Sequence, residues 1–211
     1  MVITKYEHAC FVLEETGVQL VIDPGSFTQS LPKLSKVAAI VLTHLHADHV
    51  DEGRVKQIIT DNPDTKVFST AEVAETYPNL RPLAVEPGSM HQIGPFTLAF
   101  FGGEHAIIHP SLKRFQNIGV MVNSTFFYPG DSLVLPGRPL KVLAAPAAAP
   151  WLKISEAMDY ITEAKPEIAI PTHDAILSEV GQKVHDNMLA AAAKNAGVTY
   201  QRLQIGQSIT V

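Results

Sequence analysis

Apolar residues occur along the chain in short runs that polar residues, glycines and prolines separate. Most of these runs are rich in β-branched and aromatic side chains, which predicts β-strands. The predicted strands cover residues 2–6, 10–14, 18–22, 37–42, 66–69, 90–93, 96–101, 118–122, 126–128, 140–144, 167–170, 198–201 and 208–211. The run at 37–42 is apolar throughout, which is typical of a strand that is buried on both faces.

Segments between these strands have the apolar spacing of helices instead. They are residues 53–60, 71–76, 155–161 and 179–196, and the last of them is followed by Gly197, a typical residue after a helix end. Strands followed by strand–helix pairs occur once on each side of a proline-rich segment near residues 78–95, in which the prolines at 78, 82 and 87 predict a linker before the strand at 90–93. This order predicts one domain over residues 1–211 with an α/β (α+β) fold. We expect a four-layer αββα sandwich, with the two sheets packed against each other and the helices outside.

The composition agrees with a folded domain and excludes several classes of protein. With 46% hydrophobic and 18% charged residues the chain lies in the globular range. Its strongest apolar run, six residues at 37–42, is far shorter than a membrane span. The net charge of −5 does not suit a nucleic-acid-binding protein. The single cysteine, Cys10, excludes an internal disulfide and a cysteine zinc site. Charged residues near the N-terminus stand where a signal peptide is apolar, so we expect a cytoplasmic protein.

Three histidines and one aspartate stand together directly after the buried strand at 37–42. The segment is Thr43-His44-Leu45-His46-Ala47-Asp48-His49. His44 and His46 are two positions apart, so they point the same way on an extended segment. Imidazole and carboxylate groups suit Zn, Mn or Fe at neutral pH. The segment therefore predicts a transition-metal site at the end of this strand.

The pattern H-x-H-x-D-H after a buried strand resembles the metallo-β-lactamase superfamily of binuclear metallohydrolases. That family completes its site with a histidine, an aspartate and a last histidine, each at the end of a later strand. The matching positions here are His105, Asp131 and His173, although His109 competes with His105 four residues later. The resemblance covers the chain from Asp23-Pro24-Gly25 to the final strand, and it implies a metallo-β-lactamase-like αββα fold.

By this resemblance, seven side chains form two adjacent metal sites. The implied ligands are His44, His46 and His105 for the first ion, Asp48, His49 and His173 for the second, and Asp131 as a bridge between them. The ions would be divalent transition metals, with zinc as our first choice and manganese or iron as alternatives. Two such ions hold a bridging hydroxide at neutral pH. The implied enzyme is a hydrolase that uses this hydroxide to cleave an ester, lactone or phosphodiester bond.

Further residues receive roles around these ligands. Asp48 is our candidate for moving a proton to the leaving group, and His109 is its rival. We also expect hydrogen bonds that hold the ligand imidazoles in place. The first candidate for such a bond is Asp23, followed by Thr43, Thr172 and Asp174.

Two loops bear on the substrate. Lys113 and Arg114 would suit an anionic group, although a solvated surface loop explains them equally well. Trp151 lies on a proline-stiffened loop, where it would either wall a pocket or belong to the core. We therefore expect a small, anionic substrate and no nucleic-acid or membrane partner, and leave a homo-oligomer open.

Absences narrow the choice within the superfamily. The presence of Asp131 and the lack of a signal segment disfavour an exported β-lactamase. The oxygen-reducing di-iron branch has glutamate where this chain has His46, and it usually adds a flavin domain, for which the chain has no room. What remains resembles the compact metal-dependent hydrolases, a group that includes ascorbate-6-phosphate lactonase. The alternative function is a metal-binding protein of the same fold without hydrolytic turnover.

Overall fold

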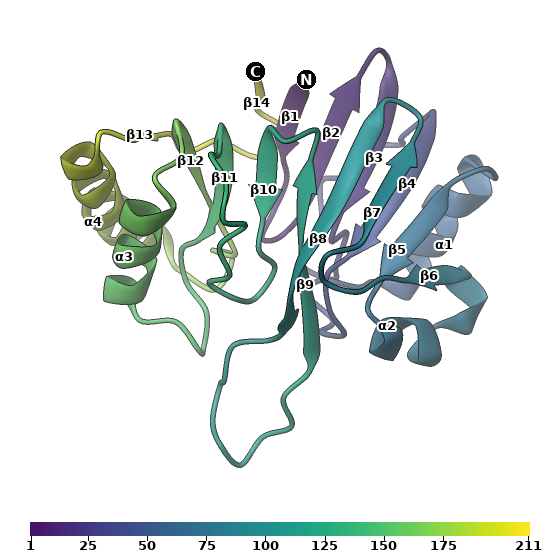
Figure 1. Ribbon diagram of the computed structural model, residues 1–211, viewed down its shortest axis with the longest axis horizontal. Coiled ribbons are helices and arrows are strands. Elements are labelled where there is room, and N and C mark those ends of the chain that lie inside the picture. The colour runs from purple at the N-terminus through teal and green to yellow at the C-terminus, as the bar shows by residue number, and fades with distance from the viewer.

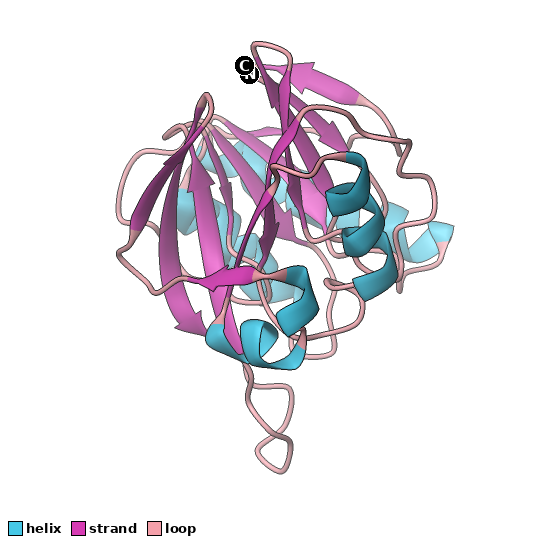
Figure 2. Ribbon diagram, turned by 90° about the vertical axis from the view of Figure 1, so that its right-hand side faces the viewer, coloured by secondary structure: helices cyan, strands magenta, loops and turns pink.

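The computed structural model describes all 211 residues and contains two β-sheets that face each other, with helices on both outer sides (Figure 1). The layers are helix, sheet, sheet and helix, which confirms the predicted αββα arrangement. Figure 2 views the molecule from the side of α1 and α2, which lie in front of the strands. None of the helices combines the length and the apolar composition that a membrane span requires.

The first sheet has seven strands, and α1 (Glu52–Asp61) and α2 (Ala71–Thr76) cover its outer face. In spatial order the strands are β14 (Ser208–Thr210), β1 (Val2–Lys5), β2 (Phe11–Glu15), β3 (Val18–Ile22), β4 (Val37–Leu42), β5 (Lys66–Ser69) and β6 (Pro82–Ala84). Strands β14 to β3 pair antiparallel, and β3 to β6 pair parallel.

The second sheet repeats this plan under α3 (Ile154–Ala164) and α4 (Glu179–Ala196). Its strands are, in spatial order, β13 (Thr199–Tyr200), β12 (Ile168–Thr172), β11 (Val142–Pro146), β10 (Phe126–Tyr128), β9 (Gln116–Val122), β8 (Phe96–Glu104) and β7 (Met90–Ile93). Strands β7 to β10 pair antiparallel, and β10 to β13 pair parallel.

Successive residues of the strands face different layers, and this alternation creates three apolar cores. Phe126 belongs to the cluster between the two sheets. Its neighbour Phe127 points outward and packs in the cluster that contains Ile161 of α3. On the first sheet, Val12 lies in the cluster that contains Val55 of α1. Strands that are apolar on both faces are therefore required on both sides of the central core.

The proline-rich segment at 78–95 is the main difference from the sequence-based expectation of a linker. It contains a 3₁₀ turn (Pro78–Leu80) and β6, which pairs in parallel with β5. Because β6 is the last strand of its sheet, Pro82 needs no N–H for a further neighbour. Strand β11 also begins at Val142, two residues later than predicted.

Candidate metal centre

The seven predicted ligands lie together between the ends of four strands. Residues 44–49 follow β4, His105 follows β8, Asp131 follows β10 and His173 follows β12. Together with His8, which was not predicted, they fall into two groups in which the potential ligand atoms all lie within 4.8 Å of one another. The groups are His44, His46, His105 and Asp131, and His8, Asp48, His49 and His173. Asp131 links the two groups, because Oδ1 lies 3.2 Å from His49 Nε2 and Oδ2 lies 3.2 Å from His173 Nε2.

Several polar atoms at the centre of this cluster are buried without a hydrogen bond. They are the Nε2 atoms of His49, His105 and His173 and the Oδ1 atom of Asp131. Buried polar groups normally have partners, so each such atom requires an explanation. All four belong to the predicted ligands, and nitrogen and carboxylate oxygen are the donors that Zn, Mn and Fe accept. The donor set therefore fits transition-metal binding.

The opposite nitrogen of each of these histidines is held by an acceptor. His49 Nδ1 lies 2.6 Å from Asp23 Oδ2, and His173 Nδ1 lies 2.7 Å from the Ala148 carbonyl oxygen. The Nδ1 of His105 lies 2.5 Å from the Ala106 carbonyl oxygen. Each acceptor keeps a hydrogen on Nδ1, so Nε2 is the nitrogen that can offer a lone pair to the centre once it is deprotonated. This is the arrangement in which protein groups orient metal-binding imidazoles.

Of the four residues expected to hold the ligand imidazoles in place, two contact these imidazoles and two do not. Asp23 contacts His49 and also accepts from the Thr43 backbone N–H and hydroxyl, at 2.8 and 2.6 Å. Thr43 Oγ1 is in turn 3.0 Å from His44 Nδ1. Thr172 and Asp174 contact no ligand imidazole: the Thr172 hydroxyl donates to the backbone carbonyl of His8, and Asp174 pairs with Arg202. The two latter side chains face the β1–β2 turn instead of the imidazoles.

Charges inside the cluster are strongly coupled. Burial raises the pKa of Asp131, but the neighbouring His49 and His173 lower this pKa further, well below its usual range. Burial lowers the pKa of His44 well below its ordinary value, so this ring is neutral near pH 7. Burial also lowers the pKa of His173, yet Asp131 outweighs burial and raises it to about 9. Asp131 and His44 are thus ready to bind a cation, whereas His173 must first release a proton.

A close backbone contact shapes the segment that carries four of the predicted ligands. The loop after β3 passes so near to residues 48 and 49 that a Cβ atom on Gly25 would lie 1.9 Å from the Asp48 carbonyl oxygen and 2.4 Å from the His49 nitrogen. Only glycine allows this approach.

We expect Gly25→Ala to displace the 44–49 segment. The added methyl group should lower the free energy of unfolding by about 1–3 kcal/mol, as overpacking does, and should weaken metal binding at both positions. Denaturant unfolding and metal analysis measure the two effects. Gly53→Ala is the control, because its Cβ meets only Asp51 Oδ1, at 3.4 Å, and it should stay within about 1 kcal/mol of the parent. Wild-type metal content in Gly25→Ala would contradict this account.

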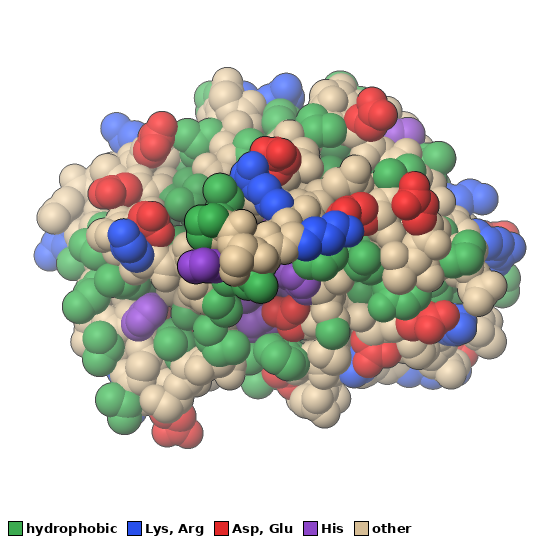
Figure 3. Space-filling model, turned by 90° about the horizontal axis from the view of Figure 1, so that it is seen from below, with side chains coloured by type: hydrophobic (Ala, Val, Ile, Leu, Met, Phe, Trp, Pro, Cys, Tyr) green, Lys and Arg blue, Asp and Glu red, His purple; other side chains and the backbone are tan.

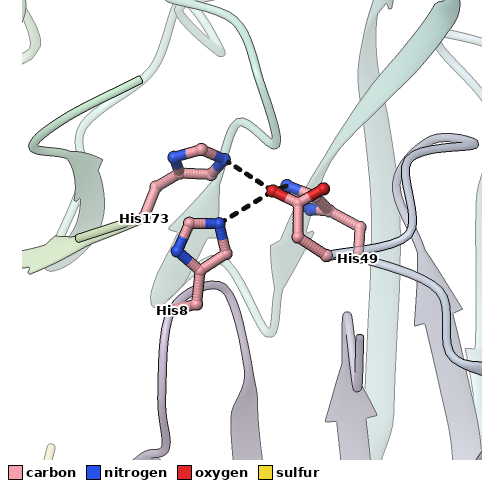
Figure 4. A group of neighbouring side chains, drawn as sticks. His8, His49 and His173 are labelled. Atoms are coloured by element: carbon pink, nitrogen blue, oxygen red, sulfur yellow. Dashed lines mark hydrogen bonds and ion pairs between the residues drawn. The ribbon is translucent and has the colours of Figure 1, made fainter. Parts of the chain in front are cut away.

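His8 belongs to the cluster, and the sequence analysis did not single it out. It lies in the turn between β1 and β2 with 1% of its surface exposed. In Figure 4, His8 and His173 converge on one carboxylate oxygen, and His49 lies beside it. That oxygen is Asp48 Oδ2, 2.9 Å from His8 Nε2 and 3.5 Å from His173 Nε2. The available signal was its position shortly after a strand end, where the predicted ligands also lie.

The loop between β8 and β9 projects from the molecule at the lower edge in Figure 1. From below, it carries basic and hydrophobic side chains in front of histidines near the middle of this face (Figure 3). His109 is exposed on this loop and its Nδ1 lies 2.8 Å from Ser111 Oγ. The structure does not bring it into either ligand group. Lys113 pairs with Glu72 at 2.9 Å and Arg114 with Glu104 at 2.5 Å, so both basic residues are already engaged.

Trp151 borders the ligand cluster directly. Its indole Nε1 donates to Asp131 Oδ2 at 2.8 Å, and its ring meets that of His105 edge-on, with 6.2 Å between centroids. The indole also lines a cavity of about 300 Å³, together with Ser132 and Leu133. Of the two sequence-based interpretations of Trp151, the structure supports the pocket wall, since the side chain is only half-buried.

Known proteins share both the sequence pattern and the fold. Residues 2–173 match the family described as the beta-lactamase superfamily domain. Protein Rv0786c of Mycobacterium tuberculosis is 35% identical over 187 residues, which cover 84% of this chain and 86% of that protein. Igni18, a metallo hydrolase from Ignicoccus hospitalis, superposes with a TM-score of 0.76 at 17% identity, over 100% of this chain and 97% of its own.

A second solved structure agrees with this assignment. YhfI of Bacillus subtilis, a metallo-beta-lactamase fold protein, superposes with a TM-score of 0.72 at 17% identity, over 96% of this chain and 91% of its own. At such identities the superpositions establish the fold, while the family match rests on the sequence itself. The chain, with its two facing sheets and its histidine–aspartate cluster at the strand ends, belongs to the β-lactamase superfamily and has the metallo-β-lactamase fold.

Proposed function

We propose that the protein is a binuclear metal-dependent hydrolase that cleaves an ester, lactone or phosphodiester bond of a small molecule. The observation that carries this proposal is the set of buried, unpartnered ligand atoms on His49, His105, His173 and Asp131. Bound metal ions would give these atoms the partners that buried polar groups normally have.

The ligands divide as the two groups in the structure suggest. The first ion would be held by His44, His46 and His105, the second by Asp48, His49 and His173, and Asp131 would contact both. When bound, the two ions supply an ionised water near neutral pH and polarise the oxygen of the substrate on which negative charge develops. Zinc is our first choice, and manganese or iron would suit the same donors.

Asp48 is the residue that we propose for proton movement. Burial raises the pKa of Asp48, but the facing rings of His173 and His8 lower it well below the usual range, so the carboxylate starts ionised. Its place among the ligands of the second metal position, beside the attacking water, makes it our candidate for taking a proton from that water and giving it to the leaving group. Its side chain is 23% exposed, which leaves a path from the substrate to this oxygen.

The cavity beside Trp151 is our proposed position for part of the substrate. It borders Asp131 through the indole, and Ser132 and Leu133 supply polar and apolar lining. Arg114 also lines this cavity, where it pairs with Glu104, so both a cation and an anion face the proposed substrate. Substrate charge is consequently a variable that the assay should include.

The test is turnover by protein reconstituted with zinc, manganese or iron. We expect metal-dependent hydrolysis of bis-p-nitrophenyl phosphate or of a member of a lactone panel containing both anionic and neutral compounds. A chelator should abolish the activity, and the matching metal should restore it. A fully metallated protein that is inert on every compound would overturn the proposal and favour the metal-binding alternative without turnover.

A further inference from the structure

His8 differs from His49 and His173 in the partners of its two ring nitrogens. Its Nε2 lies 2.9 Å from Asp48 Oδ2, and its Nδ1 accepts a hydrogen bond from the backbone N–H of Ala175 at 3.3 Å. In contrast, His49 and His173 each present Nδ1 to an oxygen acceptor and leave Nε2 without a hydrogen bond.

These partners determine which nitrogen of His8 carries the hydrogen. A backbone N–H can only donate, so the Nδ1 of His8 must supply its lone pair to Ala175. A neutral imidazole has one donor and one acceptor, so the hydrogen is on Nε2, where the ionised Asp48 accepts it. With one nitrogen used as an acceptor and the other as a donor, the ring has no lone pair left for a metal ion.

The backbone of His8 is held as firmly as its ring. Its φ of +56° is in the left-handed region, which a residue with a side chain adopts only when its surroundings require it. Its carbonyl oxygen accepts from Lys5 Nζ at 2.8 Å, from Thr172 Oγ1 at 2.7 Å and from the His173 backbone N–H at 3.0 Å. The turn after β1 is thereby tied to the end of β12 in the opposite sheet.

Neighbouring rings fix the orientation of the imidazole. The ring centroid of His8 lies 3.9 Å from that of His173 and 5.0 Å from that of Phe27, which meets it edge-on. The Asp48 oxygen that takes the His8 hydrogen also faces the Nε2 atoms of His173 and His49, at 3.5 and 3.7 Å (Figure 4).

We propose that His8 is a positioning residue for the second metal position: its Nε2–H holds Asp48 in the orientation in which Oδ2 faces His49 and His173. This role rests on the proposed binuclear function. It assigns to His8 the task of orienting a ligand without being one, and it makes the β1–β2 turn part of the metal centre.

Two substitutions separate positioning from ligation. His8→Leu removes both ring nitrogens, whereas the amide of His8→Gln can place an N–H near the former Nε2 but has no nitrogen lone pair for a metal. Titration of metal-free protein with zinc against a chromophoric chelator gives the affinity for each ion. We expect His8→Leu to weaken the second ion about 10–100-fold, the range for groups that orient ligands, with the first ion unchanged. His8→Gln should recover most of this loss.

The control is His91→Gln, which removes a histidine on β7 that belongs to neither ligand group. It should bind both ions as the parent does. Equal loss of the second ion in His8→Gln and His8→Leu would show that His8 is itself a ligand and would overturn the proposal. Unchanged affinity in His8→Leu would overturn it as well.

A measurement on the wild-type protein tests the proposal even if the His8 variants fail to fold. Long-range ¹H–¹⁵N correlation spectra of the metal-free chain identify the protonated nitrogen of His8, which we expect to be Nε2. A hydrogen on Nδ1 would overturn the positioning role while leaving the proposed hydrolase intact. A wild-type chain that binds no second ion would instead overturn the proposed function and, with it, the effect of His8 on metal affinity.

Discussion

The protein purified without chelator is expected to carry two transition-metal ions per chain. His46→Ala should retain only one of them, because His46 belongs to the first ligand group alone. Asp131→Ala should weaken both, because this carboxylate faces His105 Nε2 at 3.3 Å in one group and His49 Nε2 at 3.2 Å in the other. Removing a ligand should cost more than the roughly 10–100-fold in affinity that follows loss of an orienting group.

Thermal unfolding should report the same losses. A site that is exposed to free metal at about 1,000 times its Kd stabilises the folded state by about 4 kcal/mol. For a chain of this size, that corresponds to roughly 8–16 °C in Tm. The wild-type protein should therefore melt at a distinctly higher temperature with metal than without it, and Asp131→Ala should lose most of the increase.

The chain offers its own reporter for the metal titration. Trp151 is the single tryptophan, and its indole N–H lies 2.8 Å from Asp131 Oδ2. Its fluorescence should change as metal is added to the wild-type protein, and the response should weaken in Asp131→Ala. His91→Ala serves as the control and should behave as the parent. Only trace metal by elemental analysis, with Tm unaltered on adding zinc or manganese, would contradict the proposed centre.

The second large effect concerns the transfer of a proton to the leaving group. If Asp48 carries it, Asp48→Asn should lower kcat by about 10²–10⁴-fold, the usual contribution of an acid–base group, while metal content stays largely intact. The amide has nearly the size of the carboxylate, and it can still accept the hydrogen of His8 Nε2. Steady-state kinetics with metal-loaded protein, together with elemental analysis of the same samples, separates a catalytic loss from a loss of metal.

His109→Ala is the comparison that makes this assignment testable. The imidazole of His109 is exposed and contacts Ser111, so its removal should alter KM at most. A variant that loses kcat with both metals still bound would show that the projecting loop brings His109 to the substrate. The proton would then belong to His109 and not to Asp48.

Much of the fold is encoded in neighbouring residues, and the sequence pattern predicts it for that reason. Period-two and all-apolar runs predict the strands, since each strand must bury one or both faces. The ligand set is predicted through the family resemblance, which adds His105, Asp131 and His173 to the segment at 44–49; each of these positions follows a strand. The edge strand β6 escaped prediction because its proline is unfavourable in a central strand and tolerated only at the border of a sheet.

What the tertiary structure alone decides are the contacts between residues that lie far apart in the chain. His8 and Asp48, which share a hydrogen bond, are 40 residues apart in the sequence, and His8 and Thr172 are 164 apart. A local sequence pattern therefore does not predict these contacts. The same holds for Lys113 with Glu72 and for Trp151 with Asp131. The sequence by itself thus determines which donors stand at the strand ends. The packing of the two sheets decides which of them meet, because only this packing sets the direction of the side chains that the loops carry.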